Sequence, residues 1–358
     1  MQPRCSRGRL VWGGLLALGL TAWTATPAVA INVVLDYTHD TFFSSHPTAK
    51  AALEAAAQDI SNVIITSLNP TVDTVQGQEG SATVTFDWEL TYKNPSTGGS
   101  QTFDPVELPA DEVRLFVGVR RLTGNTLGQG GPGDAINAGI NGSWVNLSDR
   151  QAALTQGAAL SSANLGRGGG PTIGTLSDSF DGDPYSVSFG SMLGNLWFDV
   201  DTNNDGSTDS DDTLNNYWHF DHTAPVASGK YDFYSVALHE ILHAIGFGTS
   251  QTWNDLAIGD DWLGSNVIAM RGTGESLVAT SGHIADGILS TNIVNGTAQE
   301  VAMDPNLTIG QRKYLTLLDL AFLADIGWDV AVPEPAAAGL MTLSLMLTLR
   351  QRRTRPQA

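Results

Sequence analysis

The sequence predicts an α+β fold, a mixed α/β sheet domain, and three observations predict it. Residues 82–92 alternate apolar with polar side chains, the pattern of a strand with one buried face. Residues 232–244 and 315–326 place apolar side chains at helical spacing. Strands and one early helix precede residues 232–244, and loops and a last helix follow them, which is the order of a mixed sheet domain.

The other expected elements follow in chain order. Alternation predicts an opening strand over residues 31–37. Pro47 suits the first turn of a helix over residues 47–67, which Asn69-Pro70 would end. Shorter apolar runs predict two strands, over residues 113–122 and 195–200, and glycine-rich runs predict two loops, over residues 124–142 and 165–174.

The first 30 residues have the composition of a secretory signal. Three arginines precede an apolar run over residues 10–22, and Ala28-Val29-Ala30 has the small side chains of a cleavage site. The mature chain is therefore expected to begin at Ile31. The alternative is an uncleaved membrane anchor, although the run is short for a span of about 20 residues.

Residues 332–358 form a second processing segment. Pro333-Glu334-Pro335 leads into an apolar run over residues 336–349, and four arginines follow. This order resembles the PEP-CTERM sorting tail of bacterial envelope proteins. The resemblance implies transient membrane insertion, processing by an exosortase-type enzyme, and a final place on the cell surface or in the extracellular matrix. A simple C-terminal membrane anchor is the alternative.

The chain between these segments is acidic and lacks cysteine. The formal net charge is −19, and seven of the 18 basic residues lie in the two terminal segments. So acidic a surface argues against nucleic acid and anionic lipid as partners. Because Cys5 lies in the signal segment, we expect neither a disulfide nor thiol chemistry in the mature chain.

The motif His239-Glu240-Ile241-Leu242-His243 predicts a zinc site. A helix repeats every 3.6 residues, so His239 and His243 stand on one face and can share one zinc ion. Zinc lowers the pKa of a bound water to about 7, and Glu240 can then accept its proton as the general base. The apolar residues around the motif suit a buried helix.

Gly246 follows His243 by three residues and can end the helix with a positive φ. The pattern His-Glu-x-x-His-x-x-Gly resembles the metzincin clan of zinc peptidases. That resemblance implies a twisted mixed sheet, an active-site helix, and an irregular C-terminal subdomain that ends in a helix. The compact metzincin pattern has a third histidine three residues after the glycine, but here that residue is Thr249.

His283 is the only histidine downstream of the motif, and Met303 lies about 20 residues beyond it. This layout resembles the leishmanolysin-like branch of the metzincins, in which an insertion separates the helix from the third histidine. By position, the resemblance implies that His283 is the third zinc ligand and Met303 the Met-turn residue beneath the zinc. A glutamate ligand from Glu300, at gluzincin-like spacing to Asp304, is the alternative.

Two further features bear on the site. Some metzincins carry a tyrosine two residues after the methionine, but here that residue is Pro305, so stabilisation of an oxyanion would fall to the zinc and to groups that the sequence does not identify. His219 and His222 lie upstream of the motif, where we expect surface or core roles, with a substrate pocket as the alternative.

Residues 201–212 match the spacing of an EF-hand calcium loop, with Gly206 at the turn. The expected oxygen ligands are Asp201, Asn203, Asp205, Ser207 through its carbonyl, Asp209 and Asp212. A bound calcium ion would stabilise the segment that precedes the helix. The alternative is an acidic solvated loop without a metal.

These residues together predict an exported zinc metalloendopeptidase that acts on a protein or peptide substrate. We expect residues 31–331 to form the metallopeptidase domain, with one lobe up to about residue 248 and a second over residues 249–331. Two other functions stay open. One is a calcium-binding surface or matrix adhesion protein with a vestigial zinc site, and the other is a zinc hydrolase of a non-peptide matrix component.

Overall fold

The computed structural model describes residues 31–279 and 281–331. Helices and strands are interspersed along the chain, and one four-stranded sheet contains both parallel and antiparallel strands. The predicted α+β class is therefore confirmed. The signal and sorting segments predicted at residues 1–30 and 332–358 lie outside the described residues. In the part of the chain that is described, no helix is both long and apolar enough to cross a membrane.

A four-stranded sheet forms the base of the main body. Its order is β1 (Asn32–Asp36), β5 (Glu112–Arg120), β10 (Leu193–Asp199) and β6 (Gly128–Pro132). The first three strands run parallel, and β6 runs antiparallel to β10 at the edge. Strands were predicted close to the observed bounds of β1, β5 and β10, and those predictions are confirmed.

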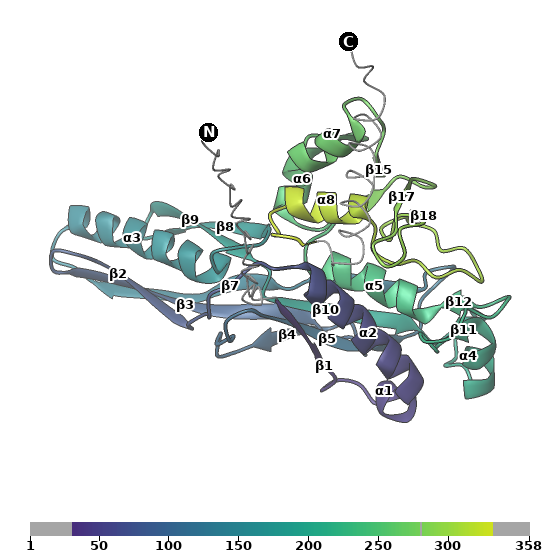
Figure 1. The fold of residues 1–358 in the computed structure, drawn as a ribbon. Helices are drawn as coiled ribbons and strands as arrows, with labels where there is room; N and C mark the ends of the chain where they lie inside the picture. The colour runs from purple at the N-terminus through teal and green to yellow at the C-terminus, as the bar shows by residue number, and fades with distance from the viewer. Residues whose placement is uncertain (1–30, 280, 332–358) are drawn as a thin grey trace, which may run out of the picture.

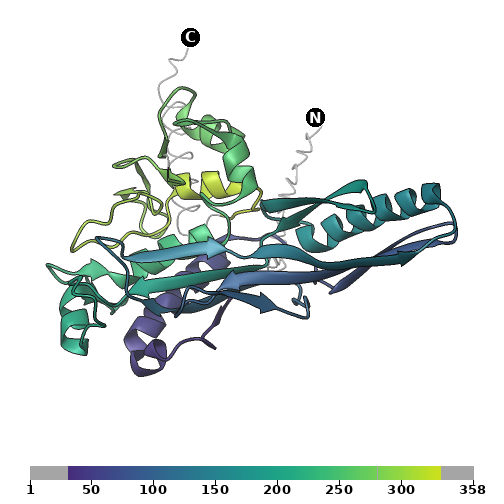
Figure 2. The ribbon, with the colours of Figure 1, turned by 180° about the vertical axis from the view of Figure 1, so that it is seen from behind.

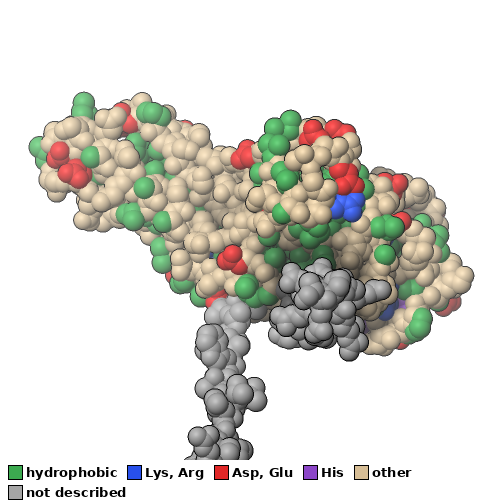
Figure 3. Space-filling model, turned by 45° about the horizontal axis from the view of Figure 1, so that its top comes forward, with side chains coloured by type: hydrophobic (Ala, Val, Ile, Leu, Met, Phe, Trp, Pro, Cys, Tyr) green, Lys and Arg blue, Asp and Glu red, His purple; other side chains and the backbone are tan. Residues whose placement is uncertain are grey.

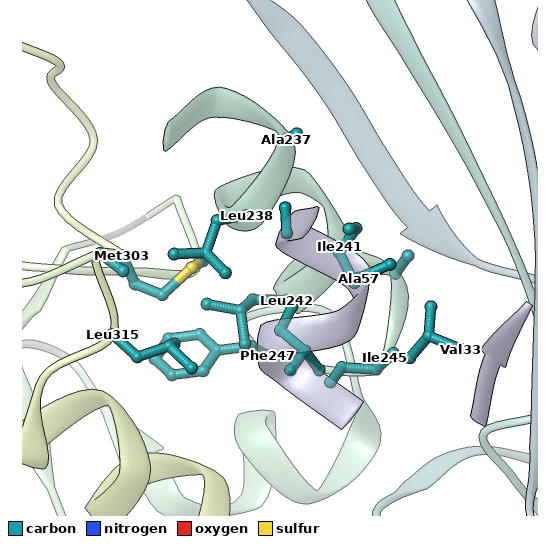
Figure 4. Packing of buried hydrophobic residues seen from close by; sticks show 14 of the residues in the cluster. Val33, Ala57, Ala237, Leu238, Ile241, Leu242, Ile245, Phe247, Met303 and Leu315 are labelled. Carbon is teal, nitrogen blue, oxygen red and sulfur yellow. The ribbon is translucent and has the colours of Figure 1, made fainter. Parts of the chain in front are cut away.

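Two helices cover one face of this sheet and pack against each other, α2 (Pro47–Val63) and α5 (Phe233–Ala244). Both were predicted, although α2 ends four residues earlier than expected because Ile64 takes an extended conformation. Apolar side chains from both helices meet strand β1 and the C-terminal segments in one buried core (Figure 4). This core holds α5, and with it the motif histidines, in the middle of the main body.

The prediction of a loop over residues 124–142 was wrong, because this segment contains β6 and β7 (Asp134–Ser143). Glycine carries no side chain, so β6 shows no alternating pattern in the sequence. Its glycines serve close packing instead, since a Cβ on Gly130 would lie 2.1 Å from the carbonyl oxygen of Glu240. Only glycine therefore lets this edge strand lie directly against α5.

An arm extends from the main body (Figures 1 and 2). It consists of a sheet, a hairpin and one helix: β2 (Thr74–Glu79), β3 (Ala82–Lys93), β4 (Ser100–Phe103) and β7, the hairpin β8 (Thr172–Phe180) and β9 (Asp183–Gly190), and α3 (Leu147–Gly166). The arm has a hydrophobic core of its own, separate from that of the main body. The predicted strand over residues 82–92 is confirmed as β3, whose burial alternates along its length.

Helix α3 was not predicted, and part of it occupies the expected loop over residues 165–174. Its buried face is built largely from small residues, so the apolar signal along the sequence is weak. Small residues are needed there because a Cβ on Gly157 would lie 2.5 Å from the ring of Phe86. The backbone of α3 therefore lies very close to the sheet. The periodicity of apolar side chains in the sequence does not reveal such a contact.

The chain after α5 forms the irregular part of the main body. It contains α6 (Gln251–Leu256), α7 (Ser265–Arg271), α8 (Leu317–Asp325) and short strand pairs, β13 (Ala257–Ile258) with β14 (Asp261–Trp262), β15 (Val278–Ala279) with β16 (His283–Ile284), and β17 (Leu289–Thr291) with β18 (Ala298–Glu300). The last predicted helix is confirmed as α8. The remaining short elements are α1 (Phe42–Ser45), α4 (Asp211–Tyr217), β11 (Trp218–His219) and β12 (Tyr231–Asp232).

Candidate metal centre

Helix α5 places two motif histidines on one face. The Asp232 side chain caps its N-terminus by accepting the backbone N–H of Ser235, and Arg312 forms a buried ion pair with the same carboxylate at 2.7 Å. The helix ends where Gly246 adopts a φ of 110°, a conformation that favours glycine. Between these ends, the rings of His239 and His243 lie with their centroids 4.8 Å apart.

The third histidine comes from strand β16. His283 Nε2 lies 3.0 Å from His239 Nε2 and 3.1 Å from His243 Nε2. Two nitrogens bound to one tetrahedral zinc at 2.0–2.1 Å would lie about 3.3 Å apart. Within residues 31–279 and 281–331, this is the only group of three or more His, Cys, Asp or Glu side chains that could hold a metal ion.

The hydrogen bonds of the rings leave their inner nitrogens free to bind a cation. His239 Nδ1 lies 2.9 Å from the carbonyl oxygen of Ala302, and His243 Nδ1 lies 2.8 Å from that of Phe247. A carbonyl only accepts, so each Nδ1 carries the proton and each neutral ring presents a lone pair at Nε2. Lone pairs that converge at 3 Å repel one another unless a cation lies between them, so the donor set fits a metal ion.

The electrostatics of the cluster favour neutral imidazoles. Burial lowers the pKa of all three histidines, and their mutual proximity adds to this for His239 and His243. The pKa of His243 falls to about 4, and that of His239 lies well below its usual value. A neutral imidazole is the form that binds a metal, so protons compete weakly for this site near neutral pH.

Glu240 lies between α5 and the edge strand. The residue is buried, and a Cβ on Gly128 would come within 3.0 Å of its Oε1. Burial raises the pKa of Glu240 to about 8, and a hydrogen bond from the backbone N–H of Gly130 offsets only part of that effect. In the metal-free protein this carboxyl therefore holds its proton at neutral pH, and a nearby cation would favour the ionised form.

A cleft of about 880 Å³ runs over the three histidines and Glu240. Its walls include the edge strand β6, from Gly128 to Pro132, and residues 304–307. Among residues 31–279 and 281–331, β6 pairs with one strand, β10, which lies along its inner edge. Its outer edge can therefore pair with an extended chain that enters the cleft.

Met303 follows Ala302, whose carbonyl oxygen lies 2.9 Å from His239 Nδ1. Its side chain is fully buried, and its thioether lies beside Leu238 and Leu242 of α5 (Figure 4). The backbone of this turn is fixed on both sides, since Met303 accepts the N–H of Ile284 and the Ala302 carbonyl meets His239. The Met303 turn thus connects the third histidine to the first.

Asp319 was missed in the sequence and holds this turn in place. Its buried carboxylate accepts the backbone N–H groups of Ala302 at 3.0 Å and Met303 at 3.2 Å, and it completes the capping box of α8 with Thr316. Burial raises its pKa. The signal was present as Thr316-x-x-Asp319, the spacing of a capping box, but its reach back to the Met303 turn is a tertiary contact.

The alternative ligand Glu300 and the other residues that the sequence singled out lie outside the group of three histidines. Glu300 pairs with Lys313 Nζ at 3.0 Å, and Asp304 accepts the backbone N–H of Gly287, so neither joins the three histidines. Thr249 donates its hydroxyl to the His243 carbonyl and lines the cleft. His219 contacts the Ala224 carbonyl at 3.3 Å and does not line the cleft.

The acidic loop over residues 201–212 connects β10 to α4. Both oxygens of the buried Asp201 carboxylate accept backbone N–H groups, from Asp205 and Gly206, and Asp209 accepts from Thr202. Asn203 and Ser207 lie in the same loop, and Asp212 lies in the first turn of α4. Calcium binding to this loop stays a prediction.

Acidic side chains are scattered over the face shown in Figure 3, and few lysines or arginines appear there. Comparison with known proteins gives the chain no family: no protein-family model matches it, and neither a curated protein nor a solved structure does. The chemistry of the site must therefore be inferred from its own residues.

Proposed function

We propose that the protein is a zinc-dependent peptidase of metzincin-like type. One observation carries the proposal: three neutral imidazoles converge on one point, two of them from α5, and the buried Glu240 of that helix lines the same cleft. Three nitrogen donors with room for a fourth ligand is the arrangement of catalytic rather than structural zinc sites. The open cleft above the histidines supports a catalytic role.

His239, His243 and His283 would hold the metal, each through Nε2. A zinc ion in that position would supply Lewis acidity, which polarises a carbonyl group and lowers the pKa of water to about 7. The carbonyls of Ala302 and Phe247 orient two of the rings and increase their basicity, as groups around metal-bound histidines usually do.

Glu240 would accept the proton of the attacking water and pass it to the leaving amine. Glu240 and the three histidines line the same cleft, so its carboxylate would lie within reach of a water bound there. The outer edge of β6 would pair with the substrate in an extended conformation, and the 304–307 wall would contact the residues beyond the scissile bond.

Substitution of the base tests this function. Glu240→Gln preserves the shape of the side chain and should leave zinc binding unchanged, while hydrolysis of casein or a peptide library falls by about 10²–10⁴-fold. Glu275→Gln, at an exposed ion pair with Arg271, is the matched control and should retain activity. A Glu240→Gln enzyme with near wild-type activity would refute the mechanism.

The same assay separates the rival functions. Cleavage of polysaccharide but not of peptides by the zinc-loaded protein would indicate a non-peptide hydrolase. Zinc binding without any hydrolysis would favour an adhesion protein. We also propose export through residues 1–30 and sorting through residues 332–358. N-terminal sequencing of the exported protein should find Ile31 first, and a start at Met1 would contradict that.

A further inference from the structure

Two glycines from distant segments touch beside the metal centre. Gly248 has a φ of 73° and Gly282 a φ of 78°. A Cβ on Gly248 would lie 1.8 Å from the carbonyl oxygen of Gly282, and a Cβ on Gly282 would lie 2.4 Å from that of Gly248. Neither position has room for any side chain, so the two backbones meet at a distance that glycine alone permits.

This contact lies between two of the three histidines along the chain. Gly248 directly follows Phe247, whose carbonyl orients His243. Gly282 directly precedes His283, whose Nε2 lies 3.1 Å from that of His243. The contact therefore joins the carbonyl that orients the second histidine to the loop that supplies the third.

We propose that Gly248 and Gly282 are positioning residues, whose mutual contact sets the approach of the His283 loop to helix α5. They act through His243 and His283 and do not touch the metal themselves. The inference rests on the metal centre of the proposed function but not on its substrate. Metal binding alone therefore tests it.

The size of the steric conflict indicates the size of the effect. A Cβ on Gly248 would have to move away from the Gly282 oxygen by more than about 1 Å to reach an ordinary contact distance. In a well-formed zinc site the metal–ligand distances lie within about 0.2 Å of their usual values, so a displacement of this size would disturb the site. The Ile284 N–H also bonds to the Met303 carbonyl, so the loop is held on both sides of His283, and the Gly248–Gly282 contact is the one on the side toward helix α5.

The test measures zinc affinity by chelator competition in Gly248→Ala, Gly282→Ala and His283→Ala. Gly274→Ala is the matched control, because Gly274 has a φ of 81° but nothing within 4 Å of its Cβ position. Both contact variants should lose zinc affinity about 10–100-fold, the usual effect of disturbing groups that orient a ligand. Wild-type affinity in both, or an equal loss in Gly274→Ala, would overturn the proposal.

Two further measurements distinguish positioning from general damage. The absorption spectrum of bound Co²⁺ should change in both contact variants toward that of His283→Ala, because the cobalt loses the same ligand. The double variant Gly282→Ala/His283→Ala should bind zinc no more weakly than His283→Ala alone. If the losses of zinc binding energy in the two single variants add up in the double variant, Gly282 does not act through His283.

Wild-type protein provides a test that does not depend on the folding of variants. Zinc should slow amide hydrogen exchange in residues 243–250 and 281–284 together, since the contact couples the two segments. Protection of the first segment without the second would contradict the proposal. If the wild type binds zinc through three histidines but cleaves no peptide, the proposed function fails and this inference stands.

Discussion

The two sides of the metal centre are built differently. Helix α5 supplies His239, Glu240 and His243 from one turn of regular backbone. The opposite side supplies His283 from a two-residue strand in an irregular segment. Helical spacing alone brings the first two histidines together, whereas the third depends on contacts with the Met303 turn and with Gly248.

This difference shows where the chain uses buried polar groups. Side chains around α5 are mostly apolar, and its backbone groups bond mainly within the helix, with Asp232 accepting the N–H of Ser235 at its start. The irregular side lacks the regular backbone hydrogen bonds of a helix. Its backbone groups bond instead to three buried side chains, those of Asp304, Lys313 and Asp319. We therefore expect the irregular side to be the more sensitive to loss of a single polar side chain.

The largest expected effect is that of Asp319→Ala. Removal of the carboxylate leaves the buried N–H groups of Ala302 and Met303 without an acceptor, at about 1–3 kcal/mol each, and also breaks the cap of α8. Urea unfolding of the metal-free protein should show a loss of more than about 3 kcal/mol. Asp149→Ala, at the exposed start of α3, should cost no more than about 1 kcal/mol. Equal losses in the two variants would contradict the comparison.

The pH dependence of the metal-free protein probes both sides together. The pKa of His243 is about 4 when folded and about 6.5 when unfolded, and those of His239 and His283 are also lowered. The unfolded chain then binds more protons over this range, so stability is lost as pH falls from 6.5 to 4. Glu240, with a folded pKa of about 8, has the opposite effect, and its contribution is lost as pH rises toward 8.

Because three histidines outnumber one carboxyl, we expect maximal stability near pH 6.5. Above that pH only Glu240 acts, and the decline should reach at most about 1.4 kcal/mol per pH unit. Glu240→Gln should abolish the decline between pH 6.5 and 8, and it should steepen the loss of stability below pH 6.5, where Glu240 opposes the histidines. Thermal unfolding across this pH range measures the loss of stability on the acid side and on the alkaline side. An unchanged alkaline decline in the variant would show that Glu240 does not cause it.

A smaller effect is expected where the edge strand meets α5. In Gly130→Ala the new methyl group would lie 2.1 Å from the Glu240 carbonyl oxygen, and relief of that overlap should cost about 1–3 kcal/mol. Gly131→Ala has nothing within 4 Å of its Cβ position and should change stability by less than about 0.5 kcal/mol. Urea unfolding of the pair measures the difference, and similar stability would mean that β6 does not depend on its glycines.

The smallest effect concerns the acidic loop before α5. With a Kd of about 1 mM, 10 mM calcium would stabilise the fold by about 1.4 kcal/mol, or a few degrees in Tm. Asp205→Asn should reduce this shift, and Asp211→Asn, outside the expected ligand set, should not. No calcium-dependent shift in the wild type would mean that the loop is simply solvated.

The elements that were predicted from the sequence share a strong local pattern. Alternation identified β3, and helical spacing identified α2, α5 and α8. Strand β6 and helix α3 were missed because their contacts depend on glycine and other small residues. Such residues form close backbone contacts with segments that are distant in the chain. The local pattern of apolar and polar residues does not identify those segments.

By itself the sequence determined the pairing of His239 with His243 and the place of Glu240 beside them, because 3.6 residues per turn is a property of any helix. Only the tertiary structure decided that His283 completes the group and that a glycine-rich edge strand lies over Glu240. The physical reason is distance along the chain. A loop of about 40 residues can close in many ways, and long-range contacts at Gly282, Met303 and Asp319 select the one that brings its histidine to α5.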